Sequence, residues 1–246
     1  INPRLRPGEV RKVMTGIPGK TGVVYTLDRE TGEFLWATPT VAQNVITHID
    51  GATGTVTENP EVIFSALGQE VLVCPSWAGG KDWEAGAYSP LTHTMYFPLR
   101  NACQRLLSTT DGSGPYALAA RHELAPGTDQ LGTVRAISVE TGETAWLYEQ
   151  RAATTSLVAT GGGLLFGGDV NGRFRAFDQD TGEVLWKVNL GSPVTGYPIT
   201  FAVDEQQYVA VSTGTAANAG INLRMTPELR PSAGNNLFVF ALPGTN

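Results

Sequence analysis

The residues of this chain that could support chemistry are few, and the two cysteines come first. Cys74 and Cys103 are the only cysteines among 246 residues, and they are 29 positions apart. A zinc site usually shows Cys-x-x-Cys or paired-histidine spacings, and neither accompanies them. A covalently attached haem needs Cys-x-x-Cys-His, which the chain also lacks. The sequence around the two cysteines therefore argues against zinc and against a covalently attached haem on this chain.

A glycine-rich segment lies between the cysteines. It reads Gly79-Gly80-Lys81-Asp82-Trp83. Glycine has no Cβ, so paired glycines let the backbone approach neighbouring groups closely.

Three aspartates that could be mistaken for catalytic bases have simpler roles. Asp28 and Asp178 each precede a Thr-Gly-Glu turn, and Asp169 lies in a Gly-Gly-Asp-Val-Asn-Gly turn. Aspartate side chains commonly accept hydrogen bonds from the backbone of such turns. We therefore assign these residues to turn structure.

A sequence repeat predicts the strands that must position the glycine-rich segment 79–83. Tyr25–Trp36, Arg135–Trp146 and Arg175–Trp186 share one pattern, in which an alternating strand is followed by Thr-Gly-Glu and a second strand ending on tryptophan. The last two copies are 40 residues apart, about the length of a four-stranded propeller blade. The repeat predicts an all-β fold, a β-propeller of antiparallel four-stranded blades.

The chain has room for four to five such blades. The first two copies are 110 residues apart, and we interpret Tyr88–Phe97, where Thr-His replaces Thr-Gly, as a degenerate copy between them. The turn glycines should adopt positive φ. The closing tryptophans should bury their rings between neighbouring blades and so act as structural staples.

Composition supports a turn-rich β protein and excludes some partners. The chain has 29 Gly, 15 Pro and 16% charged residues, with no apolar run approaching the roughly 20 residues of a membrane span. Its formal net charge is −6, whereas nucleic-acid binding needs a concentrated basic surface. We expect no nucleic-acid partner and no membrane span. We interpret Arg4, Arg6, Arg11 and Lys12 as a solvated basic cluster.

Several segments together resemble one enzyme family. They are Pro18–Arg29, Cys74–Pro90, Ala159–Asp169 and Gln207–Gly214. With the tryptophan repeat, they are similar to the C-terminal half of the pyrroloquinoline quinone (PQQ)-dependent alcohol dehydrogenases, the quinoproteins. The resemblance covers essentially the whole chain. It implies that residues 1–246 are the C-terminal portion of a single eight-bladed propeller domain that holds PQQ beside a calcium or lanthanide ion.

The resemblance also assigns candidate site residues. Lys20 occupies the position of a basic family residue that donates to the quinone oxygens, which would make it both catalytic and cofactor-binding. A fixed cation there would stabilise negative charge as hydride arrives. The alternative for Lys20 is a solvated lysine in a turn. Asp82 and Trp83 match the Asn-Trp pair of a Gly-Gly-x-Asn-Trp motif and are the other candidate PQQ contacts.

The chain departs from the family pattern at two places. Asp82 replaces the usual asparagine, so its pKa is raised, or it pairs with Lys20 or Lys81, or the cofactor contact is altered. Thr154, Thr155 and Ser156 stand where many relatives have Trp-Gly-Gly. That edge of a pocket would be smaller and more polar, and could admit a bulkier or more hydroxylated alcohol.

The rest of the expected function also follows from the resemblance. Some members join cysteines at this spacing in a disulfide, which a periplasmic location would permit. The resemblance therefore implies a disulfide between Cys74 and Cys103, and the alternative is two free buried thiols. The metal ligands and the catalytic base should lie on an N-terminal portion that completes the propeller, with an alcohol as substrate and a cytochrome c as electron acceptor; we expect no metal ligand on this chain. The alternatives are a sugar or polyol dehydrogenase of the same cofactor class and a non-catalytic propeller that acts as a protein-binding scaffold.

Overall fold

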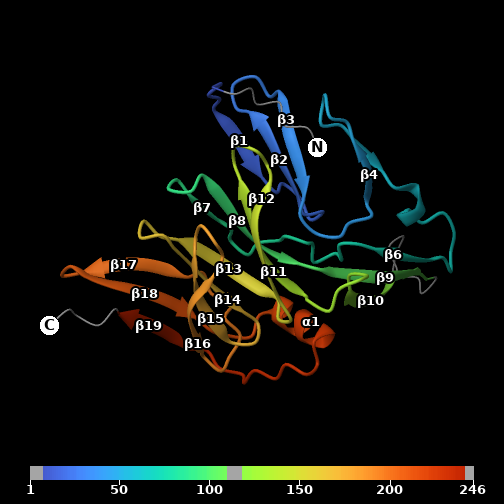
Figure 1. The fold of residues 1–246 in the computed structure, drawn as a ribbon. Helices are drawn as coiled ribbons and strands as arrows, with labels where there is room; N and C mark the ends of the chain where they lie inside the picture. Colours follow the sequence, from blue (N-terminus) through green and yellow to red (C-terminus); the bar gives the residue numbers. More distant parts are fainter. Residues whose placement is uncertain (1–7, 110–117, 242–246) are drawn as a thin grey trace. The chain divides into compact units, whose positions relative to one another are not determined.

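The computed structural model describes residues 8–109 and 118–241, and these are built almost entirely of antiparallel strands (Figure 1). The helical elements within these ranges are a short 3₁₀ turn at Pro60–Val62 and α1 at Ala217–Met225. The chain forms two compact units. The first contains the described parts of 1–82, 100–129 and 140–143, and the second contains 83–99, 130–139 and the described residues from 144 onward.

The first unit contains two three-stranded sheets and a two-stranded ribbon. One sheet has the order β1-β2-β3 and the other the order β10-β9-β6, while β4 pairs with β5. The bounds are β1 Val13–Gly16, β2 Val23–Asp28, β3 Phe34–Pro39, β4 Ile46–Ile49, β5 Val56–Glu58, β6 Glu70–Val73, β9 Ala102–Ser108 and β10 Leu118–Leu124. Buried apolar residues on β2 and β3, including Val23, Phe34 and Ala37, form the core beneath the first sheet.

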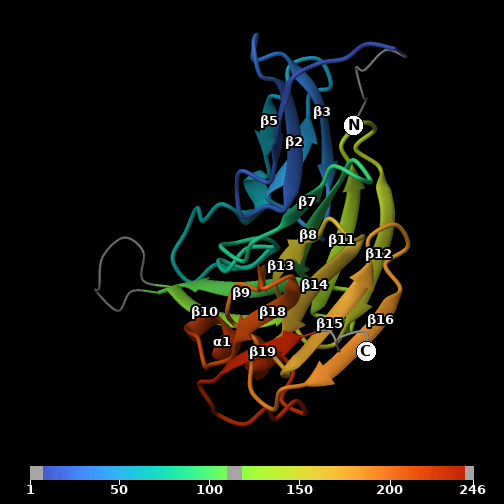
Figure 2. The same cartoon turned by 90° about the vertical axis from the view of Figure 1, so that its left-hand side faces the viewer.

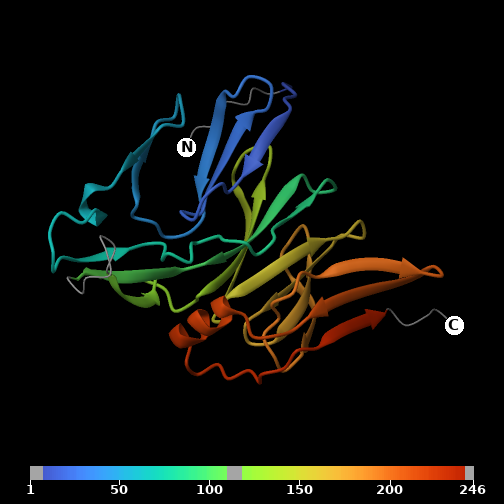
Figure 3. The ribbon, with the colours of Figure 1, turned by 180° about the vertical axis from the view of Figure 1, so that it is seen from behind.

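The second unit contains sheets of the propeller-blade type. Strands β13 to β16 pair in chain order as a four-stranded meander, and they lie side by side in Figure 2. A second four-stranded sheet has the order β12-β11-β8-β7, and a three-stranded sheet has the order β17-β18-β19, orange to red in Figure 3. The bounds are β7 Ala87–Ser89, β8 Thr94–Arg100, β11 Gly132–Ser138, β12 Thr144–Gln150, β13 Thr154–Ala159, β14 Leu164–Asp169, β15 Arg173–Asp178, β16 Val184–Asn189, β17 Ile199–Val203, β18 Gln206–Ser212 and β19 Leu237–Ala241. The predicted all-β propeller architecture is confirmed.

The three sequence repeats form three hairpins of the same design. They are β2–β3, β11–β12 and β15–β16, and each has a register shift just before its turn. The turn glycines have the predicted positive φ: 77° at Gly32, 71° at Gly142 and 73° at Gly182. Glycine is favoured there because a side chain strains this left-handed region.

Two of the three repeat tryptophans pack on a turn glycine of another repeat, whereas the predicted burial is wrong for Trp186, which is 39% exposed. A Cβ added at Gly142 would lie 2.6 Å from the ring of Trp36, and one at Gly182 would lie 2.6 Å from the ring of Trp146. Trp36 is 1% exposed and Trp146 is 8% exposed. The indole Nε1 of Trp146 also donates to the carbonyl oxygen of Gln179 at 2.9 Å. In the second unit, Trp146 therefore staples its sheet to the turn of the following blade, as predicted.

The interpretation of Tyr88–Phe97 as a separate repeat is wrong. This segment does form a hairpin, β7–β8, and His93 takes the positive φ of 50° that glycine takes in the other turns. However, β8 pairs with β11, so the hairpin belongs to the same sheet as the second repeat. The long spacing between the first two repeats is filled instead by β4, β5, β6, β9 and β10.

The turn aspartates supply a pH-dependent contribution to stability. Asp178 Oδ1 accepts from the backbone N–H groups of Asp180 at 3.0 Å and Thr181 at 2.9 Å. Hydrogen bonds to the ionised carboxylate favour it, so they hold the pKa of Asp178 below its ordinary value of 3.8, with the bond from Thr181 N–H as the largest cause.

We expect Asp178→Asn to be less stable than wild type at pH 6, with a difference that closes in acid. A lowered folded-state pKa gives stability that is fully present above the ordinary pKa and is lost as pH falls through the folded-state value. Urea unfolding midpoints of both proteins between pH 6 and pH 2.5 would measure this. A difference that stays constant across the range would show that the charge of Asp178 makes no contribution.

Candidate functional site

Lys20 is held in a corner of the first unit by three contacts. Its Nζ donates to the carbonyl oxygen of Trp77 at 2.9 Å and lies 5.7 Å from the centroid of the Trp77 ring. The same nitrogen is 3.7 Å from Oδ2 of Asp82. The Lys20 side chain is 54% exposed, so a positive charge is fixed in direction but still open to solvent.

The loop that builds this corner is fastened to the strands around it. The predicted disulfide between Cys74 and Cys103 is present, and closing a loop of this size contributes about 3–4 kcal/mol. The backbone N–H of Ser76 donates to Ala102 O at 2.7 Å. The buried Arg100 donates through Nη2 to Ala78 O at 2.6 Å. These bonds fix the path of the loop on both sides of Trp77.

The paired glycines allow the loop to pack against Lys20. Gly79 has φ +76°, and a Cβ there would be 3.1 Å from Cβ and Cγ of Lys20. A Cβ on Gly80 would be 2.4 Å from Val41 Cγ2, and Gly80 N–H donates to Lys20 O at 2.9 Å. The close backbone approach inferred from the sequence is therefore an approach to protein atoms around Lys20.

Of the three alternatives that the sequence left open for Asp82, the structure shows pairing with Lys20. Its carboxylate is the partner of Lys20, and its side chain is 19% exposed. Lys81 lies beside it and donates through Nζ to the backbone carbonyl of Asp82 at 2.6 Å rather than to the carboxylate. The structure thus brings Lys20 and Asp82 together as an ion pair.

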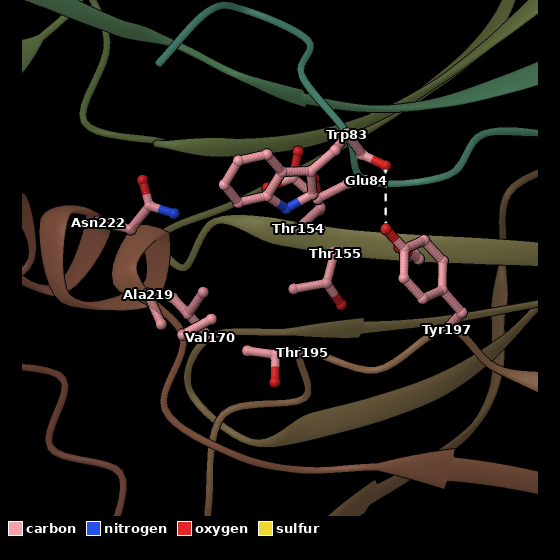
Figure 4. Close-up of a pocket in the computed structure, with 11 residues that line it drawn as sticks. Trp83, Glu84, Thr154, Thr155, Val170, Thr195, Tyr197, Ala219 and Asn222 are labelled. Carbon is pink, nitrogen blue, oxygen red and sulfur yellow. Dashed lines mark hydrogen bonds between the residues drawn. The ribbon is translucent and has the colours of Figure 1, made fainter.

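Trp83 belongs to the second unit, where it lines a small pocket of about 30 Å³ (Figure 4). Its side chain is 59% exposed, and its carbonyl oxygen accepts from the hydroxyl of Tyr197 at 3.4 Å. Figure 4 shows Thr155 and Thr195 below the indole, with Asn222 of α1 to one side. All the residues that line this pocket belong to the second unit.

The polar run Thr154-Thr155-Ser156 lines the same pocket. All three side chains are buried. Thr154 Oγ1 donates to Thr133 O at 2.9 Å, and Ser156 Oγ accepts from the N–H of Ala85 at 3.0 Å. Thr155 Oγ1 is buried without a hydrogen-bond partner among the described residues. The wall is therefore small and polar, as the sequence predicts, and carries one unsatisfied hydroxyl.

The sequence did not single out Tyr197, Thr195 and Asn222, which line this pocket. They lie on segments far from Trp83 in sequence, and no spacing pattern marks them.

The predicted turn role of Asp169 is confirmed. Its side chain is buried, pairs with Arg175 at 2.8 Å and accepts from the N–H of Asn171 at 2.8 Å.

The described residues contain neither a metal-binding cluster nor a membrane-spanning helix. Within 8–109 and 118–241, no cluster of three or more His, Cys, Asp or Glu side chains is arranged to hold a metal ion. In the same part of the chain, no helix is both long and apolar enough to cross a membrane.

The comparisons with known proteins agree with the fold. Residues 128–209 match the family model described as the glucose/ethanol/alcohol dehydrogenase β-propeller domain of the PQQ type. The chain is 34% identical over 226 residues to a lanthanide-dependent methanol dehydrogenase from Methylacidiphilum fumariolicum, covering 87% of this chain and 37% of the relative. It is 30% identical over 231 residues to methanol dehydrogenase (cytochrome c) subunit 1 from Methylorubrum extorquens, covering 89% of this chain and 36% of the relative.

A solved structure is similar to the chain in fold. A europium-containing methanol dehydrogenase superposes with a TM-score of 0.83 at 29% identity, covering 96% of this chain and 46% of that chain. The chain therefore spans less than half the length of these relatives. Residues 128–209 therefore match the PQQ-type β-propeller domain, and the chain as a whole is similar to one part of the PQQ-dependent alcohol dehydrogenases.

Proposed function

We propose that this chain is part of a quinoprotein dehydrogenase that oxidises an alcohol by hydride transfer to PQQ. The observation that carries the proposal is the fixed ammonium of Lys20, in a chain whose relatives are named methanol dehydrogenases. In this proposal Lys20 is the catalytic residue of the chain, and Lys20, Asp82 and Trp83 contact the cofactor.

The chemistry of Lys20 fits an anionic quinone. An ammonium group has three N–H donors. Trp77 O takes one of them, and Asp82 Oδ2, at 3.7 Å, lies beyond hydrogen-bond distance. Donors and solvent access therefore remain for the oxygens of a bound ligand. When bound, PQQ supplies the two-electron acceptor for the alcohol.

The side chains of the chain then have separate tasks. The ammonium of Lys20 stabilises negative charge on the ligand oxygen that it faces, because a preoriented charge needs little reorganisation during reaction. The carboxylate of Asp82 holds that ammonium in place. The exposed indole of Trp83 offers an apolar surface with a polar edge for the cofactor or substrate.

The remaining parts of the reaction belong to other segments in this proposal. An N-terminal portion of the protein supplies the catalytic base, the ligands of a calcium or lanthanide ion and the strands that complete one propeller domain with residues 1–246. The sheet β17-β18-β19 supports this, because it has three strands among the described residues, whereas a propeller blade has four. The proposed acceptor is a cytochrome c, which the name of the relative methanol dehydrogenase (cytochrome c) subunit 1 includes. The proposed location is the periplasm, where the Cys74–Cys103 disulfide could persist.

The test is native mass spectrometry of the purified full-length protein, followed by titration with PQQ in the presence of Ca²⁺ or La³⁺. We expect mass increments for PQQ and one metal ion, together with alcohol-dependent reduction of an artificial electron acceptor. A well-folded protein that takes up no PQQ with either metal would overturn the proposal and favour a scaffold function.

A further inference from the structure

The indole of Trp77 is an exposed aromatic ring that is nevertheless held in one orientation. The side chain is 53% exposed, yet its Nε1 donates to Nε2 of His122 at 3.0 Å. Its backbone N–H donates to Oε1 of Gln104 at 2.9 Å. An exposed ring gains little from burial, so a directed hydrogen bond from the indole, with a second one from the backbone of the same residue, indicates a role for its orientation.

The fixed ring presents a surface to a single cation. The Nζ of Lys20 lies 5.7 Å from the centroid of the ring, within the range in which a cation is attracted to an indole face. The carbonyl oxygen of the same residue accepts from that Nζ at 2.9 Å. Trp77 thus contacts the ammonium twice, once through the backbone and once through the ring.

The support for the ring comes from a strand distant in sequence. His122 lies on β10 opposite Gln104 of β9, so both hydrogen-bond partners of Trp77 sit at one register position of that sheet. The rings of Trp77 and His122 have centroids 6.0 Å apart at an interplanar angle of 55°. His122 therefore orients the indole by accepting a hydrogen bond from its Nε1.

We propose that Trp77 is a positioning residue for Lys20 and that His122 acts through Trp77. The ion pair with Asp82 alone fixes an exposed lysine poorly, because such pairs contribute little and leave the long side chain mobile. The Trp77 carbonyl and ring restrict the ammonium to one direction. This inference rests on the proposed role of Lys20 toward PQQ.

The first test measures the contact itself, without any cofactor. The Nζ of Lys20 lies over the indole, 5.7 Å from its centroid, so we expect NMR of the full-length protein to show the protons on the adjacent Cε shifted upfield by the ring current. We expect Trp77→Ala to abolish this shift, Trp77→Phe to retain part of it, and His122→Phe to reduce it. Leu67→Ala, which removes an apolar side chain that is 69% exposed in the same unit, should leave it unchanged. An unchanged shift in Trp77→Ala would overturn the contact.

The second test measures the consequence for PQQ. We expect Trp77→Ala to raise the dissociation constant for PQQ about fivefold, as for loss of an exposed cation–π contact, with partial rescue in Trp77→Phe. Equal PQQ affinity in wild type and Trp77→Ala would refute the positioning role while leaving the proposed function intact. Absence of PQQ binding in wild type would refute the proposed function, and the inference with it.

Discussion

Replacing Lys20 with methionine should lower PQQ-dependent alcohol oxidation by about 10²–10³-fold, the usual cost of removing one preoriented group that stabilises developing charge. Methionine keeps much of the side-chain length and removes the charge. The folded state should be little affected, because the Lys20 side chain is 54% exposed and its ion pair with Asp82 spans 3.7 Å. The measurement is kcat of the PQQ-loaded, full-length protein with an artificial electron acceptor.

Two further variants separate a role in catalysis from a general effect of charge. Lys12→Met removes a lysine of the same unit whose side chain is 66% exposed and pairs with Glu30 at 3.0 Å, and it should leave kcat unchanged. Lys20→Arg keeps a cation and should recover part of the lost rate. A Lys20→Met enzyme with wild-type kcat would eliminate Lys20 from the reaction and return it to the role of a solvated turn residue.

Removal of the Trp146 ring should destabilise the protein by about 3–5 kcal/mol, as for other buried aromatic side chains. The ring is 8% exposed and packs within a cluster that includes Tyr96, Leu157 and Phe177. The substitution Trp146→Ala also removes the hydrogen bond from Nε1 to Gln179 O. The free energy of unfolding in urea, followed by far-ultraviolet circular dichroism, would measure the loss.

The third repeat provides a matched control for this prediction. Trp186 has the same place in the sequence pattern, but it is 39% exposed and contacts Phe174 and Phe240 at their edges. Trp186→Ala should therefore cost about 1 kcal/mol. Equal losses in the two variants would show that burial on the following turn contributes little to the stability of Trp146.

The hairpins were predictable because their information is local. A strand, a Thr-Gly turn and a second strand lie within twelve residues of each other in each repeat, and an aspartate precedes the turn in two of the three. The glycine requirement is also visible in the sequence. The assignment of Tyr88–Phe97 failed for the opposite reason. Its hairpin is local, but the strand that decides its sheet, β11, begins at Gly132, and no pattern in the hairpin names that partner.

The candidate site likewise combines features that short segments reveal with contacts that depend on distant residues. Lys20, Asp82 and Trp83 could be proposed from short segments and a family resemblance, and the disulfide could be proposed from the same resemblance. The contacts of Lys20 could not, because Trp77 is 57 residues away in sequence and His122 is a further 45 beyond. The position of Trp77 in the loop depends on the register of β9 and β10, which is set by long-range pairing.

The docking of Trp146 on Gly182 has a consequence for the order in which the protein is made. Gly182 follows Trp146 by 36 residues. At a synthesis rate of about 5–20 residues per second, the turn emerges roughly 2–7 s after the tryptophan. During that interval the ring lacks the surface on which it finishes packing, so each nascent blade depends on its successor. Slow translation between the two repeats would lengthen the time for which a large indole is exposed to other nascent chains and to chaperones.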